Sequence, residues 1–215
     1  AATAPAAAPL PALTAPPPPP APREYAAVLR LLREATTSGH WPRTSAARAR
    51  VIRGGAQGGP EAGGSFTVAN SAVEDADAPP PKKKKVEGRG RQAKPQRLPL
   101  GNKLFPELAE AVFGLERALA PGRPPSSQCA INANAEFTPH VDAGRGAGQS
   151  TSLLVSLGDH AGGELVVEGV EHAVRHAPLE FDGWRARHWT RPFAGERYSL
   201  VWFTPAPAAA PRGAR

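Results

Sequence analysis

The chain has 215 residues, a formal net charge of +7 and a single cysteine, Cys129. One cysteine excludes a disulfide framework and a zinc site built from cysteines, and it favours a reducing, intracellular compartment. No apolar stretch approaches the roughly 20 residues that a membrane-spanning helix needs, so no membrane partner is expected. The basic charge permits a polyanionic partner such as nucleic acid, although a composition rich in Arg, Ala and Pro explains the charge equally well.

Pro and Gly are concentrated in the first hundred residues, so only the part after Leu100 is expected to build a hydrophobic core. Residues 1–22 contain only Ala, Pro, Leu and Thr, and repeated Pro prevents a helix, so we expect a disordered arm there. A disordered tail is expected over residues 206–215. The chain contains no Met, which indicates a fragment, a trimmed product or a partial gene model.

Residues 23–100 are predicted to hold one helix followed by a low-complexity basic linker. A helix over residues 23–36 is indicated because apolar residues recur at steps of three and four from Tyr25 to Leu32. A short strand is predicted over residues 65–69.

The linker contains four consecutive lysines, Lys82 to Lys85, which resemble a monopartite nuclear localisation signal and would imply a nuclear protein. The same run suits solvated linker charge or contact with a nucleic-acid phosphate backbone. The sequence leaves these three interpretations open.

Residues 101–205 are predicted to form a mainly β domain with flanking helices. A helix over residues 104–119 has Pro106 in its first turn, where proline is tolerated. From Gln128 onward the apolar period changes to two, with Gly, Pro and Asp-Gly turns between short segments, which indicates a sandwich or barrel. The predicted strands are residues 128–137, 150–157, 164–168, 172–175, 179–181, 188–193 and 197–204.

A candidate metal site combines His140, Asp142 and the distant His188. Two imidazole nitrogens and one carboxylate can occupy one face of an octahedron around Fe(II) and leave three positions open. The alternative is that both histidines are ordinary surface residues. A zinc site among the remaining histidines is disfavoured, because residues four apart in a strand lie far from one another and loop positions are expected there. These histidines are His160, His172 and His176.

A candidate carboxylate site lies on the last predicted strand, where Arg197 and Ser199 are two apart and share a face. Arginine makes a bidentate, charge-assisted pair with a carboxylate, and serine adds a hydroxyl. Asn132 and Asn134 are predicted to share a face of an earlier strand and to contact the cosubstrate or a metal ligand; the alternative is a strand end that solvent satisfies. Further site candidates are Gln149, Thr151, Arg185 and, for substrate contact, Trp184.

The segment from Asn132 to Pro205 resembles the Fe(II)/2-oxoglutarate dioxygenase superfamily, in which His-x-Asp, a distant His and then Arg-x-Ser recur in this order. The Asn-Ala-Asn sequence at 132–134, the Gly-rich loop at 143–149 and the closing sequence at 195–201 are most similar to the TET/J-binding-protein type, which oxidises methylpyrimidine bases. Residues 137–142 are also similar to prolyl 4-hydroxylases, in which Lys usually holds the distal carboxylate, so Arg197 favours the first type.

The resemblance implies a double-stranded β-helix, or jelly roll, that binds Fe(II), 2-oxoglutarate and O2 and oxidises a substrate C–H bond. Its metal ligands would be His140, Asp142 and His188, and Arg197 and Ser199 would hold 2-oxoglutarate. It also allows ascorbate as a further cofactor. The substrate class stays open between a nucleic-acid base, a protein side chain and a small molecule, and the alternative to an enzyme is a non-catalytic β-sandwich with basic arms.

Overall fold

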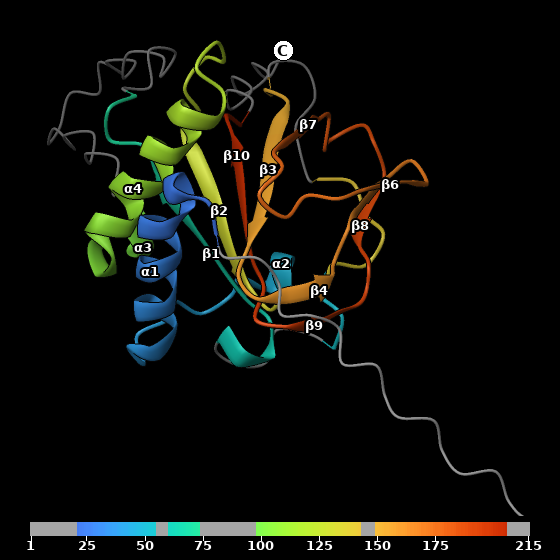
Figure 1. Ribbon diagram of the computed structural model, residues 1–215, viewed down its shortest axis with the longest axis horizontal. Helices are drawn as coiled ribbons and strands as arrows, with labels where there is room; N and C mark the ends of the chain where they lie inside the picture. Colours follow the sequence, from blue (N-terminus) through green and yellow to red (C-terminus); the bar gives the residue numbers. More distant parts are fainter. Residues whose placement is uncertain (1–20, 55–59, 74–97, 143–148, 206–215) are drawn as a thin grey trace, which may run out of the picture.

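The computed structural model describes residues 21–54, 60–73, 98–142 and 149–205. Most of the expected N-terminal arm, the lysine run, residues 143–148 of the Gly-rich loop and the expected tail lie outside these ranges. Within them the chain is mainly antiparallel β-structure with a few helices, as the sequence predicts at this level (Figure 1).

A five-stranded sheet runs through the centre of the molecule, and every neighbouring pair in it is antiparallel. The long central strands lie where the sequence predicts strands, because the alternation of apolar residues along them is a local signal of a strand. In spatial order the strands are β1 (Gly64–Ala69), β2 (Gln128–Ala133), β10 (Tyr198–Phe203), β3 (Ser152–Leu157) and β7 (Leu179–Phe181).

Two smaller sheets lie on one side of the five-stranded sheet, opposite the face that the three outer helices cover (Figure 1). One has the order β6 (Val170–His172), β5 (Leu165–Val167), β8 (His188–Thr190). The other pairs β4 (His160–Gly162) with β9 (Phe193–Gly195). The sequence did not predict β4, because its last residue, Gly162, and the following Gly163 are typical of a turn; both have positive φ.

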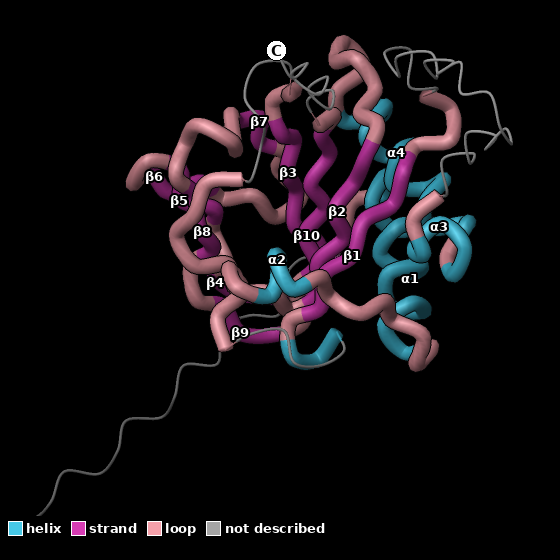
Figure 2. Tube along the Cα trace, turned by 180° about the vertical axis from the view of Figure 1, so that it is seen from behind, coloured by secondary structure: helices cyan, strands magenta, loops and turns pink. Residues whose placement is uncertain are grey.

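Three helices cover the outer face of the five-stranded sheet, as both whole-molecule views show (Figures 1 and 2). They are α1 (Arg23–Thr37), α3 (Leu100–Leu104) and α4 (Pro106–Leu119), and α1 packs against α4. The predicted helix over residues 104–119 is divided at Phe105, because the residue before a proline is driven out of the helical region. The short helices α2 (Ala46–Ala49) and η1 (Pro60–Ala62) lie in the stretch that the sequence predicts to be a low-complexity linker.

One hydrophobic core joins the three outer helices to the five-stranded sheet. Leu32 of α1 and Phe66 and Val68 of β1 belong to it together with Leu200 and Trp202 of β10. The expectation that only the part after Leu100 builds a core was therefore wrong: the apolar face of α1 and strand β1 are buried against later strands. Local composition did not indicate that either element belongs to the core, because Pro- and Gly-rich segments surround both. In the described ranges, no helix is long and apolar enough to cross a membrane.

Replacing Leu32 with Ala tests whether α1 is part of this core. Leu32 is 0 % exposed, so the loss of its side chain should lower the free energy of unfolding by about 2–5 kcal/mol. Leu98→Ala is the matched control, because Leu98 is 48 % exposed and its loss should change that free energy by less than about 0.5 kcal/mol. Denaturant titration of both variants measures the difference, and equal losses would contradict the placement of α1.

Candidate metal centre and its cavity

His140 and His188 face one another across a short antiparallel bridge. The backbone N–H of His140 donates to the His188 carbonyl at 3.0 Å, and the N–H of His188 donates to the His140 carbonyl at 2.8 Å. The two imidazole rings consequently lie close together, with their centroids 4.3 Å apart and their planes inclined by 52°. A pair of backbone hydrogen bonds thus holds together two histidines that are remote in the sequence.

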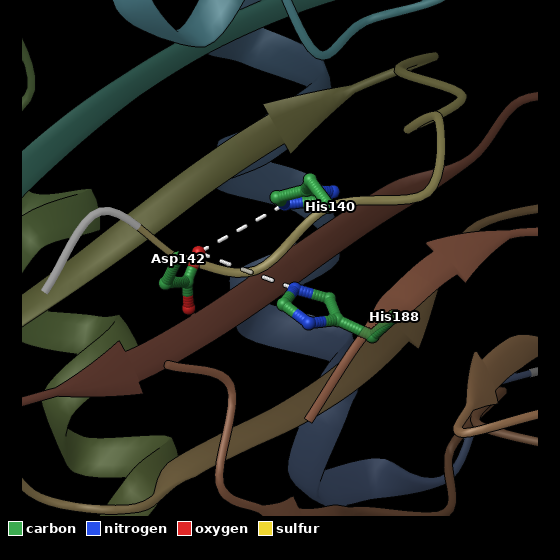
Figure 3. Close-up of side chains that lie close together, drawn as sticks. All are labelled: His140, Asp142 and His188. Carbon is green, nitrogen blue, oxygen red and sulfur yellow. Dashed lines mark ion pairs between the residues drawn. The ribbon is translucent and has the colours of Figure 1, made fainter. Parts of the chain in front are cut away.

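Asp142 completes a cluster of three candidate ligands (Figure 3). Its backbone N–H donates to the Gly183 carbonyl at 2.8 Å, and its Oδ1 lies 3.9 Å from His140 Nε2 and 4.0 Å from His188 Nε2. Each residue offers one ligand atom, and the three atoms lie within 4.8 Å of one another. The structure therefore brings together the three residues that the sequence singled out as metal ligands.

The hydrogen bonds of both rings leave the Nε2 atoms available to a metal. His140 Nδ1 lies 2.7 Å from the Thr138 carbonyl, and His188 Nδ1 lies 3.0 Å from the Ala186 carbonyl. Because a carbonyl only accepts, each Nδ1 must carry the proton, which leaves the Nε2 lone pair free. His140 Nε2 is buried and has no hydrogen-bond partner among the described residues.

Burial, first of all, lowers the pKa of His140 from its ordinary value, and the neighbouring His188 and Arg48 lower it further. The Thr138 carbonyl and Asp142 act in the opposite direction. A neutral imidazole is the form that binds a metal ion, so this environment favours the ligating state.

A glycine makes room for the carboxylate of this cluster. A Cβ at Gly183 would lie 2.6 Å from Asp142 Oδ2, closer than two such atoms can approach. The φ angle of Gly183 is not among the positive ones, so the close approach of Asp142, and not the backbone conformation, requires glycine here.

The cluster opens into a cavity of about 300 Å³ between the five-stranded sheet and the three-stranded sheet. Its walls are mostly apolar, and its charged lining residues in the described ranges are Asp142, Arg48 and Arg197 together with the two histidines. The lining also includes Phe137, Val141, Trp189 and Ser199.

Arg197 is the most deeply buried cation of the cavity, with 2 % of its surface exposed. Its Nη2 donates to the Gly163 carbonyl at 3.0 Å, whereas its buried Nε has no partner among the described residues. Burial lowers its pKa to about 10, and nearby Glu164 partly opposes this shift, so the guanidinium is charged near neutral pH. A buried cation without a paired carboxylate is costly unless an anion joins it.

Gly163 allows this placement of Arg197, because a Cβ there would lie 2.6 Å from the Arg197 Nε. Gly163 also has a φ of +80°, which an L side chain rarely adopts. Gly163, the second glycine of the predicted turn, thus leaves room for the Arg197 guanidinium where it lines the cavity.

Ser199 and Asn132 form a buried polar group beside Arg197. The two residues are register partners on β10 and β2. Asn132 Nδ2 donates to Ser199 Oγ at 3.1 Å, and Ser65 Oγ donates to Asn132 Oδ1 at 2.7 Å. Asn132 therefore orients the Ser199 hydroxyl and also lines the cavity itself.

Asn134 does not share the position of Asn132, contrary to the expectation from alternation. Strand β2 ends at Ala133, and Asn134 has a φ of +49°, so its side chain leaves the strand face. Its Oδ1 accepts from the backbone N–H of Arg197 at 2.9 Å, and its Nδ2 donates to the Pro60 carbonyl at 3.2 Å. Asn134 is not among the cavity-lining residues; it holds the backbone of Arg197 in place.

The remaining site candidates from the sequence differ in whether they reach the cavity. Gln149 lines the cavity, but Thr151, Trp184 and Arg185 do not. The Thr151 hydroxyl donates to Glu180, and the Arg185 guanidinium lies 4.4 Å from the Trp184 ring centroid.

His160 was expected on an exposed loop and is instead 5 % exposed, so that expectation was wrong. Its Nδ1 is 2.9 Å from the Gly162 carbonyl, and its Nε2 is 3.3 Å from Ser156 Oγ. Burial, with the charge of nearby Arg197, lowers its pKa to about 4 and keeps it neutral.

Arg48, Phe137 and Trp189 line the cavity and were missed as site residues. Arg48 belongs to an Arg- and Gly-rich stretch that carries no motif, so nothing in the sequence distinguished it from its neighbours. Phe137 begins the segment that is similar to prolyl 4-hydroxylases, and Trp189 directly follows His188. Their closeness in sequence to the two candidate ligands was the signal that could have identified them.

Comparisons with known proteins give remote similarities. No protein-family model and no curated protein sequence matches the chain. Among solved structures, an oxidoreductase of the 2OG-Fe(II) oxygenase family from Burkholderia pseudomallei is 26 % identical over 43 % of this chain, with a TM-score of 0.32, and the match spans half of that protein. A Pseudomonas putida prolyl-4-hydroxylase is 16 % identical, with 86 % of this chain and 87 % of that one covered and a TM-score of 0.44. At these values neither similarity decides this chain's activity, which depends on its own residues.

Replacing Gly183 with Ala tests the metal centre without touching a ligand. The new Cβ would displace the Asp142 carboxylate, so the affinity for Mn(II) or Fe(II) should fall by about 10- to 100-fold. Gly122→Ala is the control, because a Cβ there meets nothing within 4 Å and its φ is not positive. Calorimetric titration with Mn(II) measures both variants, and unchanged affinity in a folded Gly183→Ala protein would argue against Asp142 as a ligand.

Proposed function

We propose that the chain is an Fe(II)- and 2-oxoglutarate-dependent dioxygenase built on a double-stranded β-helix. The observation that supports this most is that one cavity contains both halves of the required site. His140, Asp142 and His188 form a cluster with free ligand atoms, and Arg197 lines the same cavity as a buried cation that no carboxylate of the described residues pairs with.

The three clustered residues fit Fe(II). Two neutral imidazole nitrogens and one carboxylate are the donor set that non-haem Fe(II) takes in oxygenases, and the unpartnered His140 Nε2 needs such an occupant. When bound, the iron supplies the O2 chemistry by which a substrate C–H bond becomes C–OH while 2-oxoglutarate is converted to succinate and CO2.

The chain's own residues would bind the metal and 2-oxoglutarate and orient the groups that hold them. The Thr138 and Ala186 carbonyls hold the two imidazoles in the ligating tautomer. Arg197 and Ser199 would hold the distal carboxylate of 2-oxoglutarate, with Asn132 orienting the hydroxyl. Apolar walls keep water away from these charges, which strengthens each electrostatic contact.

Finer assignments rest on the sequence resemblance alone. Arg197, in the place where prolyl 4-hydroxylases usually have Lys, favours the TET/J-binding-protein type over the prolyl hydroxylase type. Oxidation of a methylated nucleic-acid base, a role for ascorbate and a nuclear location stay predictions. The competing function, a non-catalytic binding module, predicts that the same cavity binds neither iron nor 2-oxoglutarate.

Anaerobic addition of Fe(II) and then 2-oxoglutarate tests the proposed cofactors. A weak visible charge-transfer band of the iron chelate should appear in the intact chain and be absent from His140→Ala, because that variant lacks one of the three ligands. His172→Ala should keep the band, since His172 lies on β6 and does not line the cavity. A folded intact chain without a band would move the assignment to a binding module.

Replacing Arg197 with Gln tests the cosubstrate site separately. Loss of a charge-assisted hydrogen bond costs about 1.5–3 kcal/mol, so the 2-oxoglutarate Kd of the Mn(II)-loaded chain should rise roughly 10- to 100-fold. Metal affinity should stay the same, because Arg197 is not a ligand. Arg185→Gln, a change outside the cavity, should alter neither value. A parallel loss of metal binding in Arg197→Gln would instead indicate a general structural effect.

A further inference from the structure

The cavity contains a second arginine that the proposed chemistry does not use. Among the described lining residues the arginines are Arg197 and Arg48, and the proposed function assigns only Arg197. Arg48 is half-buried on α2. This leaves one cation at the cavity that neither the metal nor 2-oxoglutarate accounts for.

Packing holds Arg48 close to the metal centre. Ser45 caps α2, and its Oγ accepts from the Arg48 backbone N–H at 3.3 Å, which anchors this short helix locally. The Arg48 guanidinium carbon lies 5.6 Å from the centroid of the Phe137 ring. The Phe137 ring in turn lies 5.7 Å from the His140 ring. One aromatic ring therefore separates the cation from a candidate metal ligand.

The Arg48 guanidinium has no protein anion as a partner. Within the described ranges, no ion pair and no side-chain hydrogen bond includes it. Glu136, the neighbour of Phe137 in the sequence, already pairs with Arg53, whose Nε lies 2.5 Å from Glu136 Oε1. Asp142 lines the same cavity, and among the described residues it forms no ion pair with Arg48. An aromatic face supports a guanidinium but does not neutralise it, so a ligand anion would complete the environment of Arg48.

The cavity that Arg48 lines is mostly apolar and small. Val51, Phe137, Val141, Trp189 and Phe203 line the same cavity. A volume of about 300 Å³ is at the lower end of ligand pockets, which suits a small molecule. A polynucleotide would require several cations in a row along its phosphates, whereas the described cavity offers this one besides Arg197.

We propose that the molecule oxidised in this cavity is a small organic acid with an apolar body, and that Arg48 binds its anionic group and so determines specificity. The proposal rests on the proposed function for the identity of the oxidant. Arg48 would hold the anion while the Phe137, Val141 and Trp189 side chains contact the apolar body, which leaves a C–H bond of that body beside the metal cluster.

The test uses small carboxylic acids with aliphatic or aromatic bodies, each paired with its uncharged primary amide. Binding to the Mn(II)- and 2-oxoglutarate-loaded chain is measured by calorimetry, and succinate formation is measured in the Fe(II)-loaded chain. The variants are Arg48→Gln, Arg48→Lys and Arg50→Gln. Arg50 is the matched control because it is exposed at the end of the same helix and does not line the cavity.

We expect at least one acid to bind about 10- to 100-fold more tightly than its amide and to stimulate succinate formation. Arg48→Gln should abolish this preference, Arg48→Lys should restore part of it, and Arg50→Gln should keep it. The 2-oxoglutarate Kd should be the same in all three variants, because the cosubstrate depends on Arg197.

Three outcomes would overturn the proposal: no acid bound more tightly than its amide, a preference that survives Arg48→Gln, or stimulation by methylated oligonucleotides alone. A 2-oxoglutarate Kd raised by Arg48→Gln would also overturn it, by assigning Arg48 to the cosubstrate. If the chain failed to bind 2-oxoglutarate but still preferred acids through Arg48, the oxygenase assignment would fall and the anion site would stand.

Discussion

The antiparallel pairing of β10 with β2 and β3 is the constraint on which the rest of the structure depends. Because side chains alternate across a strand, β10 serves two environments at once. Tyr198, Leu200 and Trp202 point into the core beneath the helices, whereas Ser199 and Val201 line the cavity. A slip of one residue in this register would turn the serine into the core and the tryptophan toward the cavity, so the packing of the core fixes the face on which the site is built.

Among the described residues, protein contacts leave some polar and charged groups of the cavity without full partners. Arg197 is buried with one carbonyl partner, and His140 Nε2 is buried with none among the described residues. Folding such groups without ligands costs free energy, and the core formed by the helices and the sheet is what can offset that cost. Two glycines, Gly163 and Gly183, are needed because the charged groups of the site occupy the space that a Cβ would take.

Segments from both halves of the chain meet at the cavity. The part of the chain after Gln128 supplies the candidate metal cluster and Arg197. The Arg-rich stretch before it supplies Arg48, on α2, and Val51, just after this helix. The outer helix α1 reaches the same region from the other side of the sheet, where Arg33 pairs with Glu196, the residue before Arg197. The N-terminal part therefore contributes to the cavity, and a description of the later strands alone would omit Arg48 and Val51 from its lining.

The sequence by itself determined the mainly β class and the α1 and α4 helices, and it singled out the three residues of the candidate metal cluster. Period-two alternation, a three-to-four-residue apolar repeat and the His140-x-Asp142 spacing are all local signals, and local signals survive without knowledge of contacts. Tertiary structure alone decided that β1 and α1 join the core, that Asn134 turns away to hold the Arg197 backbone, and that Arg48 lies over Phe137. These depend on pairing between segments far apart in the chain and on a positive φ at one residue, and neither leaves a periodic trace in the sequence.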